Sequence, residues 1–415
     1  MSFPDFPDKP AFGHNKLPAT IENVEHLLRH TGVTVRYNVI KKKDEVIIPD
    51  HKGTSDNLDN VTLTTIVSNA AKHGLPTGLV PDFVQAIADR NAYNPVADWI
   101  NSRPWDGTDR LDEFYATVTV QAEYPEELKV TLIGKWLLSA AAAALVPSGF
   151  KCRGVLTLQG PQGIGKTSWV KALISDAALR DDVVKLDHHL DTSNKDTVLG
   201  AITNWIVEIG ELESSFRKDI ARLKGFLTTD ADRVRRPYGR RESEYPRRTV
   251  FVATVNDANF LTDSTGNTRW WTIPAEKLDF KHAIDMQQVF AQLAIDLESG
   301  AEWWLTADEE RQLEAWNSRH LAVSAIAEKL ADFIDMATTP RRKLPMLTAT
   351  EMLEVMGYER PTNAQAKECA AALRDCLGES KRINGINRWK VPLREPNADS
   401  LKPIQQRQMV TNEIF

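Results

Sequence analysis

The sequence predicts an α/β protein that is built around a parallel β-sheet. Apolar strand-like segments alternate with helical patterns from about residue 150 to residue 275, and such alternation is typical of parallel strands joined by crossover helices. The first of these strands runs into a glycine-rich loop and a helix at residues 154–173. Mostly helical patterns come before this region, and two helices with a strand pair come after it. We therefore expect a central α/β domain, a helical domain before it and a winged-helix-like domain after it.

Composition and periodicity divide the chain into six segments. The first is rich in Pro, Phe and Asp without periodicity, and the last is polar, so both ends are expected to be flexible. Helical patterns dominate the second segment, except for a strand pair expected at residues 34–49. The expected boundaries are a flexible arm at 1–20, an N-terminal helical or collar domain at 21–145, the α/β domain at 146–280, a helical segment at 281–340, the winged-helix-like domain at 341–395 and a flexible tail at 396–415.

Five strands are expected within the α/β domain. Each is short, apolar and rich in β-branched or aromatic residues, as in a sheet that is buried on both faces. We place them at residues 154–160, 183–187, 204–210, 248–256 and 269–274. Ligands of open parallel sheets bind beyond the carboxyl ends of the strands, so the polar residues that follow these strands are candidates for a functional site.

The loop after the first strand fits the phosphate-binding pattern G-x-x-x-x-G-K-[ST]. Its glycines let backbone N–H groups turn toward a β-phosphate, and the next helix directs its positive dipole end at the anion. Lys166 can reach the β- and γ-phosphates, and the Thr167 hydroxyl can bind Mg²⁺. We therefore expect ATP and Mg²⁺ to bind here. The expected nucleotide-binding residues are Gly160, Pro161, Gln162, Gly163, Ile164, Gly165, Lys166, Thr167 and Ser168.

Two carboxylates at the end of the third strand are candidates for catalysis. A nucleotide hydrolase needs such groups to hold the metal and to polarise water. Glu211 lies just beyond the expected strand end, where a water-activating acid belongs, and Glu208 lies earlier and could help to bind the metal. The Asp usual at this motif is absent, so the division of roles stays open, and either residue could instead be a surface carboxylate. The expected metal ligands are Thr167, Glu208 and Glu211.

Two further polar residues follow in the order that such a site requires. Asn256 ends the fourth strand, where an amide can orient the attacking water; the alternative is a turn-forming role, since Asn-Asp favours turns. Arg269 precedes the fifth strand. In ring-shaped ATPases an arginine from a neighbouring subunit stabilises transition-state charge, and Arg269 is the candidate, with an ordinary salt bridge as the alternative. Weaker candidates are Lys151, Arg153 and Arg217.

An arginine-rich segment at residues 228–250 separates the acid-bearing strand from Asn256. A turn at residues 237–240 predicts a β-hairpin or an extended loop. The net charge of −6 argues against a surface that binds polyanions everywhere, so we expect DNA contact through this local patch, because arginines neutralise phosphates and tyrosines stack on unpaired bases. A solvated charged loop is the alternative. The expected DNA-binding residues are Arg233, Arg235, Arg236, Tyr238, Arg240 and Arg241, and the segment also holds Tyr245, Arg247 and Arg248.

The N-terminus and the cysteines indicate a reducing compartment. The N-terminus lacks the basic-then-apolar layout of a secretion signal, and no apolar run is expected to be long enough to span a membrane. Cys152, Cys369 and Cys376 are too few and too scattered for a disulfide framework or a zinc site. We expect a cytoplasmic protein without membrane contact.

These motifs, in this order, resemble those of the virulence-associated E family of phage and mobile-element ATPases, which is related to superfamily 3 helicases. The resemblance rests on residues 94–114, 158–173, 205–213, 235–241, 246–256 and 260–274. It implies an AAA+-like P-loop core, a homo-hexameric ring and ATP-driven movement on single-stranded DNA during element replication.

The same resemblance implies roles for individual residues. Lys166 and Thr167 bind nucleotide and Mg²⁺, Glu211 activates water, Asn256 senses the γ-phosphate and Arg269 is the arginine finger. Larger relatives carry a primase domain upstream. The residues before the matching region contain no acidic cluster that resembles a polymerase site, so a separate primase is a candidate partner.

The winged-helix-like domain has two interpretations. Residues 363–378 would form its recognition-type helix and residues 381–391 its wing. DNA binding would use phosphate contacts from the wing, through Lys381, Arg382, Arg388 and Lys390. Protein docking is the alternative, because the helix has few basic residues.

The combined prediction is an ATP-dependent replicative DNA helicase that forms a ring and translocates on single-stranded DNA. A non-motor ATP-dependent switch, which binds an origin or recruits a partner, is the alternative. A P-loop kinase of small molecules is disfavoured, because the sequence offers no acceptor-substrate lid and the arginine-rich segment would have no role.

Overall fold

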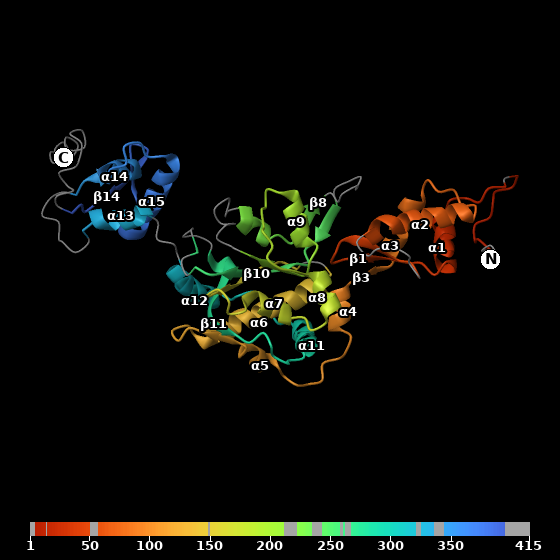
Figure 1. Ribbon diagram of the computed structural model, residues 1–415. Coiled ribbons are helices and arrows are strands. Elements are labelled where there is room, and N and C mark those ends of the chain that lie inside the picture. The colour runs from red at the N-terminus through yellow and green to blue at the C-terminus, as the bar shows by residue number, and fades with distance from the viewer. Residues whose placement is uncertain are drawn as a thin grey trace. The chain divides into compact units, whose positions relative to one another are not determined.

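The computed structural model describes residues 5–13, 15–49, 57–147, 150–210, 222–234, 243–257, 260–261, 267–320, 325–335 and 344–394. It divides the chain into two compact units, Met1–Leu321 and Ala322–Phe415, whose helices and strands are labelled in Figure 1. Two clusters of buried apolar side chains belong to the first unit and one to the second.

The first unit begins with a small α/β module that has its own core. Its elements are α1 (Ile21–His30), β1 (Thr34–Asn38), β2 (Lys43–Ile47), α2 (Leu58–Lys72), α3 (Val80–Arg90) and β3 (Ala92–Tyr93). The strands form a sheet of order β2-β1-β3, and the expected strand pair is β1–β2. Phe6 is buried in the core, and the backbone of Asp8 hydrogen-bonds to Asn23 of α1. This part of the segment expected as a flexible arm therefore packs against α1.

A six-stranded sheet of order β4-β11-β5-β10-β7-β6 forms the centre of the first unit (Figure 1). Its strands are β4 (Val118–Val120), β5 (Val155–Gln159), β6 (Val184–Lys185), β7 (Ile206–Ile209), β10 (Val250–Val255) and β11 (Trp270–Leu278). All neighbours are parallel except β4, which runs antiparallel to β11. The five expected strands are present, and their burial explains their continuous apolar sequences. β4 is an additional strand, too short to be predicted.

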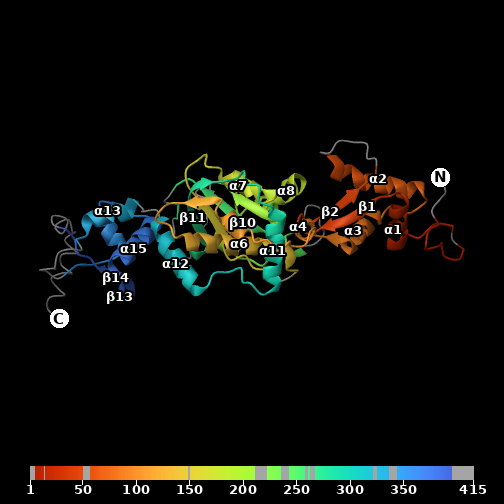
Figure 2. The ribbon, with the colours of Figure 1, turned by 90° about the horizontal axis from the view of Figure 1, so that it is seen from below.

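Helices cover this sheet. Those that connect its parallel strands are α7 (Lys166–Ala172), α8 (Ala177–Val183) and α9 (Lys195–Ile202). Those from the flanking segments are α4 (Pro95–Ile100), α5 (Leu111–Tyr115), α6 (Glu126–Leu145), α11 (Met286–Glu298) and α12 (Ala307–Asn317). Figure 2 shows α7 and α8 on one side of the strands and α6 on the other. α6 packs against β5 and β10, and α11 packs beside α6.

By length and composition α6 could cross a membrane, which corrects the expectation that no apolar run is long enough. The apolar sequence has another cause, because 72% of its most apolar window is buried inside the protein. Trp136 and the run from Ala140 to Ala143 are fully buried. The small side chains let α6 approach the sheet closely, so it is the central helix of the core.

The segment between α4 and α5 packs against α11. The Asp106 carboxylate pairs with Arg110, and the Asp106 N–H donates to Gln288 Oε1 over 2.8 Å. The Arg110 guanidinium and the hydrogen bonds that the carboxylate accepts hold the pKa of Asp106 well below its usual range. This part of the collar is therefore fixed to the helix that lies beside α6.

Two smaller features complete the first unit. The arginine-rich segment forms an antiparallel pair of β8 (Ala231–Val234) and β9 (Ser243–Pro246), as the turn between them predicts. The 3₁₀ turn η2 (Asn267–Arg269) leads directly into β11, and η3 (Ser318–His320) follows α12.

The second unit combines three helices with a three-stranded sheet of order β12-β14-β13. Its elements are α13 (Ala325–Phe333), β12 (Met346–Leu347), α14 (Ala349–Val355), α15 (Asn363–Leu377), β13 (Lys381–Ile383) and β14 (Ile386–Lys390). Capping boxes begin α14 and α15, in which Thr348 pairs with Glu351 and Thr362 with Gln365. Trp389 of β14 is buried in the core between the helices and the sheet.

Candidate functional site

The loop between β5 and α7 turns at glycines that no other residue could replace without strain. Gly163 and Gly165 have φ angles of 88° and 94°, a region that residues with a Cβ atom rarely adopt. Gly165 also packs against the Phe280 ring, and Gly160 against the Ala275 carbonyl, so closely that a Cβ atom would clash. The glycines of the sequence motif are therefore required by the shape of the loop.

Lys166 begins α7 and is 8% exposed. Its Nζ donates to the carbonyl oxygens of Gly160 (2.6 Å) and Pro161 (2.9 Å) and to Asn256 Oδ1 (2.9 Å). Because an ammonium group can only donate, the amide oxygen of Asn256 faces it. The structure thus brings together the lysine of the loop and the amide that follows β10.

A second contact, between Thr167 and Glu208, lies near that of Lys166 with Asn256. The Thr167 hydroxyl donates to Glu208 Oε1 over 2.6 Å, and Glu208 is 1% exposed. Burial of a carboxylate requires hydrogen bonds or a cation. A hard cation such as Mg²⁺ prefers these oxygen donors and completes its shell with waters and phosphate oxygens. Thr167 and Glu208 therefore fit the protein side of a Mg²⁺–nucleotide site.

The described residues hold no group of three or more His, Cys, Asp or Glu that could bind a metal ion alone. Mg²⁺ is commonly held by one or two carboxylates together with substrate phosphates. A site with few protein ligands beside a phosphate-binding loop therefore fits an ion that arrives with a nucleotide.

Strand order explains why these side chains meet. β10 lies between β5 and β7, and all three are parallel. Their carboxyl ends therefore share one edge, which brings the loop after β5, Asn256 after β10 and Glu208 near the end of β7 together. The carboxyl ends of the strands are the usual ligand site of open α/β sheets.

Sequence reasoning missed a contribution from the segment after β6. The backbone N–H of His188 donates to the Glu208 carbonyl over 2.9 Å, and the N–H of Asp187 lies 3.4 Å from Glu208 Oε2. Asp187 has a positive φ of 49° and lies against Gly210, where a Cβ atom would clash with its carboxylate. The sequence Asp-His-His after an apolar strand was the available signal.

Several predicted site residues lie outside the described residues. They are Glu211, Arg217, Arg235, Arg236, Tyr238, Arg240 and Arg241. Glu208 accepts a hydrogen bond from Thr167, the other described residue that is expected to bind the metal. The water-activating role of Glu211 stays a prediction.

The described arginines near the β8–β9 hairpin differ in accessibility. Arg233 is exposed and pairs with Glu244 over 2.8 Å. Arg247 is fully buried, and its guanidinium pairs with Asp232 and lies over the Phe226 ring. Burial lowers the pKa of Arg248. Arg247 is therefore a structural residue that fixes the base of the hairpin, unlike the exposed Arg233.

Arg269 lies at the amino ends of the strands, whereas the phosphate-binding loop lies at their carboxyl ends. β11 and β5 are parallel and in register from Trp270 beside Val155 to Pro274 beside Gln159. At about 3.3 Å per residue, the strand separates Arg269 from the loop of its own chain by at least about 13 Å. Arg269 therefore cannot contact a nucleotide held by its own loop.

Arg269 shares a cavity of about 350 Å³ with Lys151 and Arg153. The other lining residues are Thr228, Thr268, Trp271, Trp304, Leu305 and Glu310. Cys152 is buried between the two exposed cations, and burial raises the pKa of its thiol to about 11. Among the described residues, Arg269 Nε is buried without a hydrogen-bond partner. The cavity is therefore cationic and suited to an anionic group.

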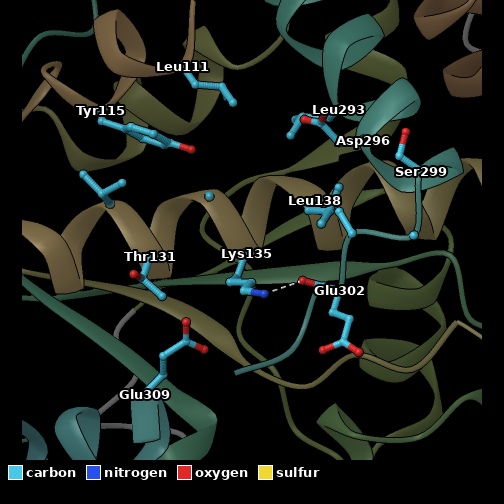
Figure 3. A pocket seen from close by; sticks show the side chains of 14 residues that line it. Leu111, Tyr115, Thr131, Lys135, Leu138, Leu293, Asp296, Ser299, Glu302 and Glu309 are labelled. Carbon is cyan, nitrogen blue, oxygen red and sulfur yellow. Dashed lines mark hydrogen bonds between the residues drawn. The ribbon is translucent and has the colours of Figure 1, made fainter. Parts of the chain in front are cut away.

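A larger cavity, of about 600 Å³, lies away from these residues (Figure 3). It is lined by α5, α6, α11 and the segment that leads to α12, including Tyr115, Lys135 and Asp296. Lys135 Nζ donates to the Glu302 carbonyl over 2.7 Å, and burial raises the pKa of Asp296. It contains none of the predicted site residues, so its size does not identify it as the functional site.

Comparison with solved structures gives distant likenesses. The A form apo structure of the NrS-1 C-terminal region has 12% identity and a TM-score of 0.39, with 89% of this chain and 98% of that chain covered. A second A form apo structure of this region has 14% identity and a TM-score of 0.38, with 89% and 99% covered. These TM-scores are too low to support a conclusion about fold or activity.

Comparison at the level of sequence families is decisive. No curated protein matches the chain. The family model of the virulence-associated protein E-like domain matches residues 100–322, which is more than half of the chain and includes the phosphate-binding loop, Glu208, Asn256 and Arg269. The resemblance noted from the motifs is confirmed, and the chain belongs to the virulence-associated protein E-like family.

Proposed function

We propose that the protein is a Mg²⁺-dependent ATPase that works as a ring-forming replicative DNA helicase of a phage or mobile genetic element, in the bacterial cytoplasm. The main support is the meeting of Lys166 with Asn256 and of Thr167 with Glu208 at one edge of three adjacent parallel strands. These are the group types that a phosphoryl-transfer site requires: a cation, a metal-side hydroxyl and carboxylate, and an amide.

In this proposal the core is AAA+-like, and the second unit is winged-helix-like. Lys166 exchanges its carbonyl acceptors for the β- and γ-phosphates, because an ammonium forms stronger hydrogen bonds with anionic oxygens than with neutral ones. Thr167 and Glu208 would hold Mg²⁺, which would supply positive charge against the phosphates. Asn256 orients the attacking water, and Glu211 accepts its proton.

Arg269 completes the site of a neighbouring subunit in this proposal. Arg269 lies at the end of the strands opposite the phosphate-binding loop of its own chain. This argues against contact with nucleotide bound to the same chain and favours contact with nucleotide bound to a neighbouring subunit. An unpartnered guanidinium nitrogen in a cationic cavity is an arrangement that a phosphate group would stabilise. A ring in which each nucleotide lies between two protomers brings the two edges together.

Movement on DNA would come from the β8–β9 hairpin, which joins the acid-bearing strand to the strand of Asn256 through the arginine-rich segment. Arg233 lies on the exposed part of this hairpin. Cleavage of the γ-phosphate changes the contacts of Glu208 and Asn256, and both flank the hairpin in sequence. The non-motor switch is the alternative, and it needs no such displacement.

The proposal is tested with purified full-length protein. We expect ATP hydrolysis that requires Mg²⁺, rises with single-stranded DNA and accompanies a ring seen by negative-stain microscopy with an ATP analogue. Charge reversal at Arg235 and Arg236 should remove DNA stimulation and unwinding while basal hydrolysis remains. Stimulation that survives the reversal would favour the switch, and absence of any Mg²⁺-dependent ATP binding would refute the proposal.

A further inference from the structure

The β13–β14 hairpin, residues 381–390, ends in a two-residue turn (β13 and β14 are labelled in Figure 2). Ile383 pairs with Ile386, and the two residues between them, Asn384 and Gly385, have φ angles of 48° and 81°. Positive φ at both positions defines the two-residue turn that matches the twist of an antiparallel pair, and Asn-Gly is its preferred sequence. The tip is therefore preorganised.

The two faces of this hairpin have different chemistry. Residues directly opposite in an antiparallel pair project to the same face, and faces alternate along a strand. Trp389 faces the core: it is 4% exposed, and its Nε1 donates to the Gly378 carbonyl over 3.0 Å. By alternation the outward face carries Ile383 with Ile386, then Lys381 with Arg388.

The tip of the outward face is apolar. Ile383 and Ile386 are 40% and 51% exposed, and they are neighbours. These two adjacent, half-exposed isoleucines are not part of the core cluster of the described residues of their unit. They are available as a small apolar wedge for a partner.

The rest of the hairpin is cationic. Lys381, Arg382 and Lys390 are exposed, and the structure gives none of them an ion pair with another described residue. Arg388 differs, because it pairs with Glu351 over 2.8 Å and donates to the Met346 carbonyl. This corrects the expectation that Arg388 supplies charge for binding, and it leaves Lys381 and Lys390 as the available cations of the outward face.

The helix α15 offers no comparable charge. Its exposed charged side chains are Lys367, Glu368, Arg374 and Asp375, so their net charge is zero. Arg374 also lies 3.7 Å from Glu379. A polyanion would therefore be attracted to the hairpin rather than to α15.

We propose that this hairpin binds duplex DNA. Lys381 and Lys390 of the outward face neutralise backbone phosphates beside a groove, and Ile383 and Ile386 contact base edges or sugars inside it, as apolar wedges of DNA-bending proteins do. Lys381 and Lys390 have no ion pair with another described residue, which favours a polyanion over a protein partner.

This site is separate from the proposed ATPase site. The test therefore uses full-length protein without nucleotide, and it is repeated in the Lys166→Ala background. Fluorescence anisotropy with a labelled 25-base-pair duplex gives the dissociation constant at several salt concentrations. If the ATPase proposal fails, this measurement is unaffected.

The double variant Lys381→Ala/Lys390→Ala should bind duplex about tenfold more weakly, and its salt dependence should fall by about two phosphate contacts. Ile383→Ser/Ile386→Ser should weaken binding with an unchanged salt dependence, because it removes no charge. Lys367→Ala, on exposed α15, is the matched control and should bind as the wild type does. Thermal melting verifies that each variant is folded.

Three results would overturn the proposal. Duplex affinity and salt dependence could be unchanged in the lysine double variant, which would leave protein docking as the role of the hairpin. Lys367→Ala could cause an equal loss, which would show only a general charge effect. The loss could also be equal on single-stranded DNA, which would refute the assignment to duplex.

Discussion

Polar side chains lie at both ends of the strands of the central sheet, at a carboxyl edge and an amino edge. The two edges differ in how many of these polar atoms have hydrogen-bond partners. At the carboxyl edge, Lys166 bonds to Asn256 and Thr167 bonds to Glu208, so each cation or acid already has protein partners. At the amino edge, Arg269 Nε has no hydrogen-bond partner among the described residues, and a cationic cavity surrounds it. One edge is a preorganised site, and the other holds a buried guanidinium nitrogen without a partner among the described residues.

This difference teaches which parts act alone and which require assembly. Preorganised groups stabilise a developing charge without reorganising during the reaction. Cations without partners repel one another, and they are stabilised only when an anion arrives. The carboxyl edge should therefore bind nucleotide in a single subunit, whereas the amino edge should matter only between subunits. The predictions below separate the two edges.

The largest effect is expected for Lys166→Ala. Loss of charge-assisted hydrogen bonds to two phosphates should weaken ATP binding by about 1,000-fold and abolish turnover. Isothermal titration calorimetry and a phosphate-release assay measure the two effects. Lys171→Ala is the control, because Lys171 is an exposed residue of the same helix. Normal ATP affinity in Lys166→Ala would refute the phosphate-loop assignment.

Arg269→Ala should spare nucleotide binding and lower kcat by about 1,000-fold in the oligomer, as expected for an arginine finger. The matched control is Arg319→Ala, since Arg319 is exposed and lies over the Trp316 ring. Binding and turnover are measured on the same preparation. Equal turnover with and without the arginine, in a preparation that forms rings, would make it an ordinary surface residue.

Glu208→Gln keeps a hydrogen-bond acceptor for Thr167 but removes the negative charge that suits a cation. The Mg²⁺ concentration for half-maximal ATP binding should rise about 10- to 100-fold. Titration of a fluorescent ATP analogue with Mg²⁺ measures this without turnover. Glu276→Gln, at an exposed position of β11, is the control. An unchanged Mg²⁺ requirement would contradict a metal role for Glu208.

The smallest expected effect concerns the pH dependence of stability. It tests the packing of His282 against Phe114 of the collar segment and involves neither edge of the sheet. Both ring nitrogens of His282 are buried without a hydrogen-bond partner among the described residues, and its ring packs edge-on to Phe114. Burial lowers the pKa of His282 below that of the unfolded chain. The unfolded chain therefore binds the proton more readily, so the free energy of unfolding should fall as the pH drops below about 6.5.

His282→Phe keeps the ring packing and removes the titration, so the melting temperature should fall less between pH 7.5 and pH 5.5 than in the wild type. His189→Gln, at an exposed position, should retain the full fall. Differential scanning calorimetry compares the three proteins. The same fall in His282→Phe and the wild type would mean that other groups cause the acid sensitivity.

Local features of the fold could be predicted, whereas long-range placement could not. The strand, glycine loop and helix around Lys166 follow from neighbouring residues, because glycine positions and apolar periodicity are local signals. The contacts of Glu208 with Thr167 and with the segment of Asp187 depend on strand order, which periodicity does not encode. The edge on which Arg269 lies depends in the same way on β11 pairing with β5.

Charge patterns were informative about regions but not about single residues. The arginine-rich segment is a hairpin, yet sequence alone could not distinguish buried Arg247 from exposed Arg233. The wing-like strands are present, yet Arg388 is committed to Glu351. In both cases the arginine pairs with an acid of another element, which is Asp232 for Arg247 and Glu351 for Arg388. Sequence composition does not predict such a pairing.

The most direct test of the account mixes two inactive proteins. Lys166→Ala supplies an intact Arg269, and Arg269→Ala supplies an intact phosphate-binding loop, so a boundary between them should contain one complete site. We predict that mixing restores a substantial fraction of ATP hydrolysis, with a maximum near equal amounts of the two proteins. If the mixture forms rings but hydrolyses ATP no faster than the separate variants, Arg269 does not act across a subunit boundary.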